Sequence, residues 1–311
     1  MTGKRVMVIG GTGKIGKHLV PKLVGMGNEV HAIARFGKPG QREALEAIGV
    51  TCFAADVTDP NAFDSIPADY DAVFDEAGLK FGSDADFDAT CAINVRSHGR
   101  AMEHFASTQA FLLASSGNVY ADGTEGADES TPPLPPSAYA LTRLGGEWMV
   151  DYFSRRNNTP AVLQRIFYGY HEEFGVPTDI ARQLRDGEPV DLTTSYVNVI
   201  WLDDLMDAMI ASWEVATVPA RPLNMTGTEI VSVRAIAERL GEFMGIEPTF
   251  TGEPKGTSLL ANADEMVRLL GEPKTSLDEG LRRVAASVMA REHPLDHPTQ
   301  WEKRTGFGYD D

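Results

Sequence analysis

The chain has 311 residues, of which 42% are hydrophobic and 23% are charged. This is the composition of a globular protein, and the length allows one large domain or two of moderate size. The net charge of -17 opposes binding to phosphate backbones and to anionic lipid. We therefore expect neither nucleic acid nor a membrane among the partners.

Cysteine and histidine usage excludes two further classes. The chain has only two cysteines, Cys52 and Cys91, which cannot build a disulfide framework or a metal quartet. Its seven histidines follow no metal-ligand pattern, so we expect no metal. The first apolar run is too short for a signal peptide, and no stretch is long enough to span a membrane. We expect a cytoplasmic protein.

Strand-like and helix-like segments alternate along the first half of the chain. Short apolar runs predict strands at 6–9, 29–34, 51–55, 71–74, 110–115 and 161–166. Apolar residues at helical spacing predict helices at 14–24, 43–48, 60–65, 87–106 and 139–156. The alternation is typical of an α/β fold with a doubly wound parallel sheet.

The second half is less regular. Residues 122–136 are rich in Gly, Asp, Thr and Pro, which predicts a loop. Further on, helices are expected at 180–184, 202–216, 233–244 and 277–289, with short strands at 197–200 and 222–225. We expect these segments to contribute a smaller α/β domain.

A glycine-rich turn joins the first strand to the first helix. Gly10, Gly13 and Gly16 are spaced three residues apart in the sequence IGGTGKIG. Glycine permits a tight turn and lets backbone N–H groups approach a pyrophosphate, and the helix N-terminus adds partial positive charge. The strand–turn–helix context predicts a dinucleotide site.

The end of the second strand distinguishes between cofactors. A site for NAD usually has an acid there, which binds the ribose 2′-hydroxyl. This strand ends instead in Ala34 and Arg35, with Lys38 close behind. The cations favour a 2′-phosphate and hence NADP; the alternative is NAD, with Arg35 stacked on the adenine. Asp56, after the third strand, is a candidate acceptor for the adenine amino group.

Two polar motifs follow in chain order. Ser115 ends the fifth predicted strand and Ser116 follows it, and Tyr139 and Arg143 lie one helical turn apart at the start of a helix. With the N-terminal glycines, these motifs resemble the extended short-chain dehydrogenases/reductases, the NAD-dependent epimerase/dehydratase family. The resemblance extends nearly over the whole chain, through the segments 94–96, 201–205, 223–227 and 269–281.

The resemblance implies a Rossmann domain and a set of site residues. The Rossmann domain is expected to comprise residues 1–166 and roughly 197–228, and the substrate domain 167–196 and 229–311. In the family, a tyrosine exchanges a proton with the substrate and a serine hydroxyl polarises the same oxygen. By position these are Tyr139 and Ser116, with Asn118 and Tyr168 as further substrate contacts. The cofactor contacts are expected to be Gly10, Gly13, Lys14, Ile15, Gly16, Arg35, Asp56, Val57, Ala77, Asn94, Tyr139 and Arg143.

Arg143 is the main departure from the family pattern, which is Tyr-x-x-x-Lys. The family lysine bonds the nicotinamide ribose. Arginine keeps the charge and still bonds ribose hydroxyls, but it is planar and bulkier. We expect cofactor binding to persist and turnover to be altered.

Other departures bear on the reaction. Dehydratases of this family carry Asp-Glu after the polarising hydroxyl residue, but Gly117 and Asn118 stand there, so we expect no dehydration. Nucleotide-sugar epimerases carry an Asn where Tyr168 stands and an Arg where Val197 stands. Because this chain lacks both the asparagine and the arginine of the epimerases, we expect a substrate without a nucleotide diphosphate.

The leading hypothesis is an NAD(P)-dependent oxidoreductase that acts on a small hydroxy or carbonyl compound such as a sugar or sugar acid. The first alternative is a nucleotide-sugar epimerase, and the second is a non-catalytic dinucleotide-binding protein. The resemblance also implies a homodimer, formed by the helices that start near Phe87 and Tyr139. The apolar residues compatible with that interface are Phe105, Leu144, Trp148 and Tyr152.

Overall fold

The computed structural model describes residues 1–121, 126–255, 259–293 and 298–301. The chain divides into two compact units, each with residues from several parts of the sequence. The first unit comprises Met1–Ser116, Ala138–Arg165 and Met206–Leu223. The second comprises Gly117–Ser137, Ile166–Leu205 and Asn224–Asp311.

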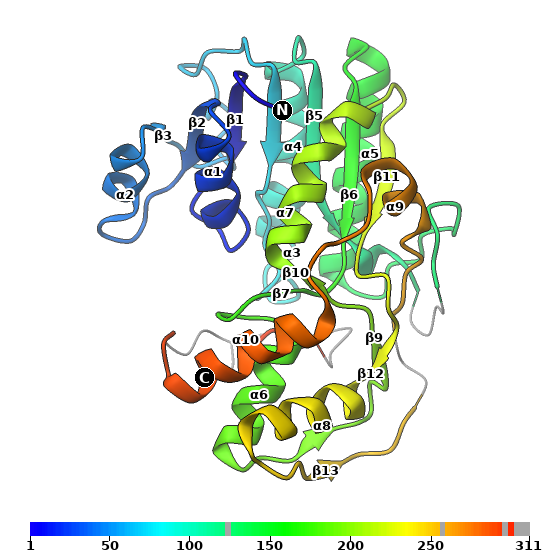
Figure 1. Cartoon of the computed structure of the whole chain (residues 1–311). Helices are drawn as coiled ribbons and strands as arrows, with labels where there is room; N and C mark the ends of the chain where they lie inside the picture. The colour runs from blue at the N-terminus through cyan, green and yellow to red at the C-terminus, as the bar shows by residue number, and fades with distance from the viewer. Residues whose placement is uncertain (122–125, 256–258, 294–297, 302–311) are drawn as a thin grey trace. The chain divides into compact units, whose positions relative to one another are not determined.

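A seven-stranded sheet is the centre of the first unit (Figure 1). Its order is β11-β6-β5-β4-β1-β2-β3, so the chain runs outward from β1 to β3 and then crosses back to β4 on the other side. Strands β1, β2, β3, β4 and β5 pair in parallel where they neighbour each other. The strands are β1 (Arg5–Ile9), β2 (Glu29–Ala34), β3 (Thr51–Ala54), β4 (Ala72–Asp75), β5 (Ala110–Ser116), β6 (Ala161–Ile166) and β11 (Arg221–Met225).

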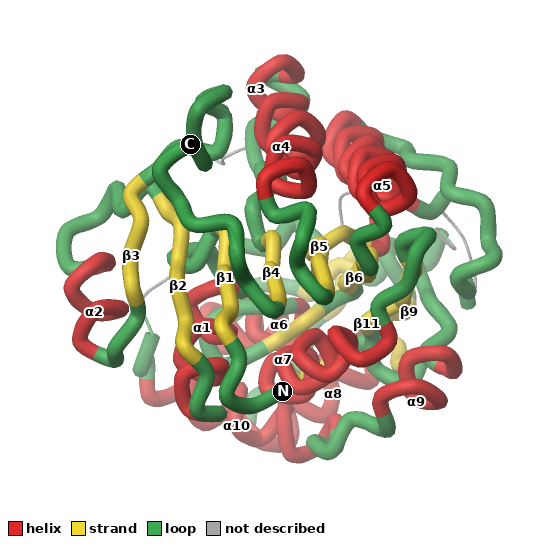
Figure 2. Tube along the Cα trace, turned by 90° about the horizontal axis from the view of Figure 1, so that it is seen from above, coloured by secondary structure: helices red, strands yellow, loops and turns green. Residues whose placement is uncertain are grey.

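Helices cover both faces of this sheet (Figure 2). Helices α3, α4 and α5 lie on one face, and α1 and α7 on the other. Val6, Met7, Val8 and Ile9 are all buried, as expected of a strand enclosed on both faces. The helices are α1 (Gly16–Gly25), α2 (Gln41–Ala47), α3 (Phe87–Cys91), α4 (Ser97–His104), α5 (Ala138–Asn157) and α7 (Leu202–Ala211).

Four helices and three short strand pairs form most of the described part of the second unit. Helices α6 (Val176–Asp186), α8 (Val233–Met244) and α10 (Leu277–Ala290) pack on one another around a buried apolar cluster that includes Ile180, Leu240 and Leu281. The remaining helix is α9 (Asp264–Leu270). The paired strands are β7 (Gly169–Tyr170) with β10 (Ile200–Trp201), β9 (Tyr196–Val197) with β12 (Val231–Ser232), and β8 (Val190–Asp191) with β13 (Phe250–Thr251).

Most expected elements are present, and the differences have local causes. The segment expected as a helix over 60–65 is a series of turns, in which the N–H groups of Ala62, Asp64 and Ile66 donate to the carbonyl three residues before them. The helix expected over 87–106 is interrupted by a π-helical segment, Ala92–Arg96, between α3 and α4. Helix α9 follows Asn262, whose side chain accepts from the Asp264 N–H, and was not expected from the sequence.

The two units and the expected domain boundaries differ at residues 117–137, 166, 197–205 and 224–228. These segments belong to the second unit. Tyr120 is one reason: its hydroxyl lies 3.0 Å from Asn224 Oδ1 and 3.0 Å from the Asp128 carbonyl oxygen. Hydrogen bonds between such distant parts of the chain are not visible in local sequence patterns. Among the described residues, no helix is long and apolar enough to cross a membrane.

Candidate active site

The turn after β1 requires glycine at two positions. Gly10 has a φ of +82°, and a Cβ on it would lie 3.1 Å from the Ala77 nitrogen. A Cβ on Gly16 would collide with the Gly10 carbonyl oxygen and lie 2.9 Å from the Gly11 carbonyl carbon. The Gly13 N–H donates to the Gly10 carbonyl at 2.9 Å, which closes the turn. Helix α1 therefore begins against the end of β1 with no side chain between them.

This cradle fits a dinucleotide. The first N–H groups of a helix lack partners within the helix and carry partial positive charge, so the start of α1 attracts a pyrophosphate. Lys14 adds an exposed cation and Ile15 precedes the first residue of α1. The expected contacts Gly10, Gly13, Lys14, Ile15 and Gly16 are thus all part of one turn.

Side chains from two later helical segments form hydrogen bonds with the backbone of the loop after β4. Arg143 Nη1 donates to the Ala77 carbonyl oxygen at 2.9 Å, and Arg143 is only 4% exposed. Asn94 donates to the Leu79 carbonyl oxygen at 2.9 Å and accepts from the Leu79 N–H at 2.8 Å. Two side chains from two helices thus hold the three residues 77–79.

The side chain of Asn94 forms its hydrogen bonds with other groups of the protein. Besides the two bonds to Leu79, its amide nitrogen lies 3.0 Å from Thr142 Oγ1, and its side chain is buried. It lies in the π-helical segment 92–96, a backbone form that is rare and frequent at functional sites. Asn94 therefore acts as a positioning residue for the loop and for the start of α5.

Tyr139 and Arg143 lie one turn apart in the first half of α5 (Ala138–Asn157). Tyr139 is half-buried, whereas Arg143 is buried. Ser116 is the last residue of β5 and is 5% exposed. Three residues of the expected catalytic set therefore belong to the first unit and come from the end of β5 and the start of α5.

A buried ion pair fixes α5 to the sheet. Arg165 of β6 donates to Glu147 of α5 at 2.7 Å, from Nη2 to Oε2, and at 3.0 Å, from Nε to Oε1. Ser115 of β5 donates to the same carboxylate at 2.6 Å. Because side chains alternate along a strand, Ser115 and Ser116 point to opposite faces of the sheet. Ser115, next to Ser116 in the sequence, thus helps to hold the helix that carries Tyr139.

Two further expected cofactor residues follow the outer strands. Arg35, directly after β2, is exposed, and among the described residues it has no hydrogen bond or ion pair. Asp56, after β3, accepts from the Thr58 N–H at 2.9 Å and from the Thr58 hydroxyl at 2.8 Å. Those bonds lower the pKa of Asp56. Val57, beside it, is half-buried and packs against the apolar cluster under the sheet.

Asn118 and Tyr168 belong to the second unit, unlike the rest of the expected site. Asn118 is in a short 3-10 segment, and Tyr168 has a φ of +28°. Gly117 packs so closely on Phe167 that a Cβ would overlap the Phe167 ring. Position 117 therefore has no room for the aspartate that dehydratases carry.

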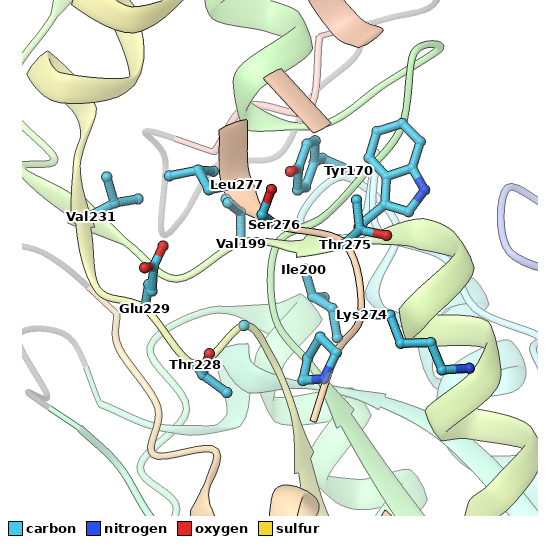
Figure 3. Close-up of a pocket in the computed structure, with 13 residues that line it drawn as sticks. Tyr170, Val199, Ile200, Thr228, Glu229, Val231, Lys274, Thr275, Ser276 and Leu277 are labelled. Carbon is cyan, nitrogen blue, oxygen red and sulfur yellow. The ribbon is translucent and has the colours of Figure 1, made fainter. Parts of the chain in front are cut away.

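Figure 3 shows a pocket of the second unit, where α10 begins. It encloses about 260 Å³. Its polar lining includes Lys274, Ser276 and Glu229, and its apolar lining includes Val199 and Leu277. Tyr170 also borders it, but the Tyr170 side chain is otherwise a core residue, 1% exposed. None of the site residues expected from the sequence lines this pocket.

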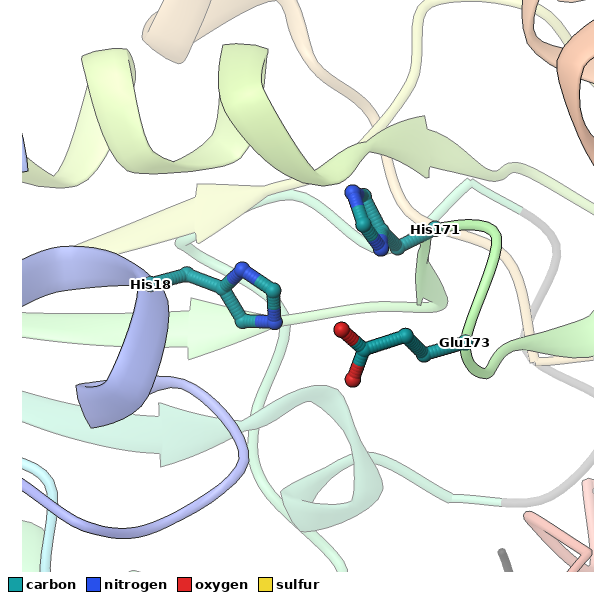
Figure 4. A group of neighbouring side chains, drawn as sticks. All are labelled: His18, His171 and Glu173. Atoms are coloured by element: carbon teal, nitrogen blue, oxygen red, sulfur yellow. The ribbon is translucent and has the colours of Figure 1, made fainter. Parts of the chain in front are cut away.

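Figure 4 shows three ionisable side chains from different elements: His18 on α1, and His171 and Glu173 on the loop after β7. Within the second unit, His171 Nε2 lies 2.8 Å from Glu172 Oε2, and the imidazole packs at 37° to the Trp201 ring. His171 is thus fixed by its own neighbours.

The sequence analysis did not predict a group of buried ionisable side chains at the end of β4. Asp75 Oδ2 lies 2.7 Å from His98 Nδ1, and both side chains are fully buried. The next residue, Glu76, has both carboxyl oxygens buried and without a hydrogen-bond partner among the described residues. The signal was in the sequence: two acids directly follow the apolar run Ala72–Phe74.

The doubly wound sheet and the glycine turn at the end of β1 define a Rossmann-type fold. Residues 6–224 match the model of the NAD dependent epimerase/dehydratase family. The chain therefore belongs to this family, whose members are enzymes.

Individual relatives are distant. A Bacillus subtilis (strain 168) protein, described as an uncharacterized UDP-glucose epimerase, is 23% identical over 188 residues; the match spans 56% of this chain and 59% of that protein. The structure of UDP-glucuronic acid 4-epimerase from Bacillus cereus, in complex with UDP-glucuronic acid and NAD, has a TM-score of 0.79 at 21% identity and covers 92% of this chain and 99% of that one. MoeE5, in complex with UDP-glucuronic acid and NAD, has a TM-score of 0.77 at 25% identity, with 93% of this chain and 99% of that one covered. These likenesses support the fold.

Proposed function

We propose that this chain is a nicotinamide-dinucleotide-dependent enzyme that oxidises or reduces a hydroxyl or carbonyl carbon of a small, sugar-like substrate. One observation carries the proposal: the glycine turn and helix α5 meet the same residue, Ala77. A Cβ on Gly10 would lie 3.1 Å from the Ala77 nitrogen, and Arg143 Nη1 lies 2.9 Å from the Ala77 oxygen. The phosphate cradle and the helix that carries Tyr139 are therefore parts of one constellation.

The chemistry follows from the residues at the end of β5 and the start of α5. The dinucleotide, when bound, supplies the hydride acceptor or donor. Tyr139 Oη takes the proton of the substrate hydroxyl as a carbonyl forms, and returns it in the reverse direction. The Ser116 hydroxyl donates a hydrogen bond to the same substrate oxygen, which stabilises charge on it. Arg143 keeps the loop 77–79 in place beside them.

The cofactor we favour is NADP. Arg35 follows β2 with an exposed guanidinium group, at the position where an acid would bind a ribose 2′-hydroxyl. A guanidinium group binds a phosphate through two parallel hydrogen bonds. NAD, which both of these structural neighbours bind, is the alternative.

Cofactor preference can be tested by Arg35→Ser. A hydrogen bond to a charged group contributes about 1.5–3 kcal/mol, so we expect the Kd for NADP to rise about tenfold or more while the Kd for NAD changes little. Arg42→Ser is the matched control, because Arg42 is nearby and its guanidinium pairs with Glu46 at 2.7 Å. Equal effects of Arg35→Ser on both dinucleotides would assign Arg35 to adenine stacking and leave NAD as the cofactor.

The substrate we favour lacks a nucleotide diphosphate. Val197, at the position of the epimerase arginine, is fully buried in the core of the second unit and pairs with Val231. Position 197 itself therefore offers no cation to a diphosphate. Dehydration is disfavoured by Gly117, whose packing on Phe167 leaves no space for an acid.

Nucleotide-sugar epimerisation is the second candidate, favoured by the UDP-sugars that both structural neighbours hold. The two candidates differ in cofactor turnover. An oxidoreductase changes the nicotinamide absorbance in proportion to product, whereas an epimerase oxidises and re-reduces one carbon with no net change.

The deciding experiment follows nicotinamide absorbance with NADP or NAD across free sugars, sugar acids and UDP-sugars, with products identified by NMR. Steady reduction of dinucleotide by a non-nucleotide alcohol is the expected result. Isomerised UDP-sugar without net reduction would replace the leading proposal by epimerisation. Dinucleotide binding without any reaction, combined with activity gained by Arg143→Lys, would indicate a chain that has lost its chemistry at Arg143.

We also propose a homodimer formed through the outer surface of α5. Leu141, Trp148 and Tyr152 lie seven and four residues apart and are 45%, 63% and 58% exposed. Phe105 and Leu144, which the sequence also offered for an interface, are buried in their own chain. The apolar stripe is therefore narrower than expected and consists of residues 141, 148 and 152.

A further inference from the structure

The side-chain carboxyl of Glu76 has no visible structural role. It directly follows β4, and its N–H continues the sheet by donating to the Ile9 carbonyl at 2.9 Å. The residue keeps some exposed surface, but both carboxyl oxygens are buried and lack hydrogen-bond partners among the described residues. Burying a carboxylate without a partner is costly, so proteins rarely retain one without a use.

The surroundings of Glu76 favour its uncharged form. Burial and the negative charge of Asp75, on the same strand, raise the pKa of Glu76 to about 8, against a smaller opposing effect of Arg143 on α5. His98, on α4, faces this group only through Asp75, whose Oδ2 it contacts at 2.7 Å. From β1, the neighbours are the backbone of Ile9 and Gly10.

Arg143 does not neutralise Glu76 by a direct contact. Its Nη1 donates to the Ala77 carbonyl oxygen, and its Nε is buried without a hydrogen-bond partner among the described residues. The pair is thus a nearby but unbonded acid and cation. The protonation of such an acid depends on any further charge that enters the same low-dielectric region.

Glu76 also lies at the cofactor end of the sheet. A Cβ on Gly10 would be 3.1 Å from the Glu76 carbonyl carbon, so the glycine turn rests on Glu76 itself. In the register of β4 and β5, Asp75 faces Leu113, which puts Glu76 opposite Ala114. Side chains alternate, so Glu76 and Ser116 leave from the same face, opposite to Val73, Ala77 and Leu113 of the apolar cluster.

We propose that Glu76 is a proton site linked to the charge of the nicotinamide: a carboxylic acid in the free protein, which ionises when an oxidised, positively charged dinucleotide binds. The O–H bond breaks with its electron pair left on the carboxylate, and the proton passes to the buffer. A reduced, uncharged nicotinamide leaves the proton in place. This inference rests on the proposed dinucleotide site.

Isothermal titration calorimetry measures such a proton directly. The full chain is titrated at neutral pH with the oxidised and the reduced form of the preferred dinucleotide, in phosphate and in Tris, whose ionisation enthalpies differ. We expect release of on the order of one proton per chain with the oxidised form and far less with the reduced form. Glu76→Gln should retain binding and lose most of the release.

Glu129→Gln is the matched control, because Glu129 is another acid, half-buried in the second unit, with a pKa raised by burial. We expect its proton release to equal that of the unaltered chain. If Glu76→Gln releases as many protons as the unaltered chain on binding the oxidised dinucleotide, the proposal for Glu76 is overturned and the proposed dinucleotide site is unaffected. Absence of binding by either dinucleotide form would instead overturn the proposed function.

A second measurement on the unaltered chain covers the case that Glu76→Gln does not fold. The infrared difference spectrum on addition of oxidised dinucleotide should show loss of one protonated carboxyl C=O band. Addition of the reduced form should not. An unchanged band in both spectra contradicts the proposal.

Discussion

At the scale of single residues, Glu147 and Arg143 fix α5 to the sheet and to the loop after β4. Glu147 bonds both Ser115 and Arg165, and Arg143 bonds Ala77, and none of these bonds uses the Tyr139 hydroxyl. Loss of the phenol hydroxyl should therefore affect chemistry and leave the fold intact.

Tyr139→Phe tests this separation. We expect turnover to fall by about 10²–10⁴, the usual contribution of a general acid or base, with the Kd for the dinucleotide almost unchanged. Steady-state rates and calorimetric binding measure the two effects. Tyr152→Phe, on the exposed surface of the same helix, is the control and should keep both values. A Tyr139→Phe variant with full activity would remove Tyr139 from the mechanism.

The buried carboxyl of Glu76 makes stability depend on pH. Its pKa is raised from 4.5 to about 8, so the folded chain binds more protons than the unfolded chain between these values. The free energy of unfolding then falls as pH rises through this window, by at most about 1.4 kcal/mol per pH unit. Below the window the cost is absent, because the group is protonated in both states.

Glu76→Gln should remove this part of the pH dependence. Urea unfolding at several pH values between about 5 and about 8 measures it, with Glu43→Gln on the exposed surface of α2 as the control. We expect the variant to gain stability over the unaltered chain as pH rises. If the free energy of unfolding changes with pH equally in the variant and in the unaltered chain, Glu76 is already ionised in the folded protein.

At the scale of elements, α1 offers a comparison within one helix. Gly16, at its start, has no room for a Cβ because of the Gly10 carbonyl oxygen, while Gly25, at its end, has nothing within 4 Å of the same position. The two glycines therefore have different physical reasons to be there. Only the first is needed to bring the helix against the strand.

Gly16→Ala should destabilise the chain and weaken dinucleotide binding at least tenfold, because the turn must open to admit the methyl group. Gly25→Ala should leave binding unchanged and alter stability by less than about 1 kcal/mol, in either direction. Thermal unfolding and calorimetry compare the two variants. Similar behaviour of both would show that the close approach at Gly16 is not essential.

At the scale of the whole molecule, we propose that the outer surface of α5 forms a dimer interface. Trp148→Glu places a charge in the centre of the stripe formed by residues 141, 148 and 152. We expect it to convert a dimer to a monomer in light scattering after size exclusion, since an unpaired buried charge is costly at an interface. Met289→Glu, on the exposed side of α10, is the control and should stay dimeric. A monomeric unaltered chain would end this proposal.

The sequence alone was enough for the class of fold, and it predicted the local motifs of the candidate site. Periodicity and length separated strands from helices over the first half, and β2, β6 and α8 have the bounds expected from the sequence. The glycine spacing and the Tyr139–Arg143 pair are local patterns, because each depends on residues within one turn or one helix. These are the features that neighbours in sequence specify.

Tertiary structure decided the rest, because it depends on residues far apart in the chain. The boundary at Gly117 reflects the bond from Tyr120 to Asn224, 104 residues away. The role of Arg143 follows from Ala77, 66 residues before it. Burial raises the pKa of Glu76, and no local sequence pattern measures burial. Asp75 and Glu76 look alike in sequence, but among the described residues only the Asp75 carboxyl has a hydrogen-bond partner.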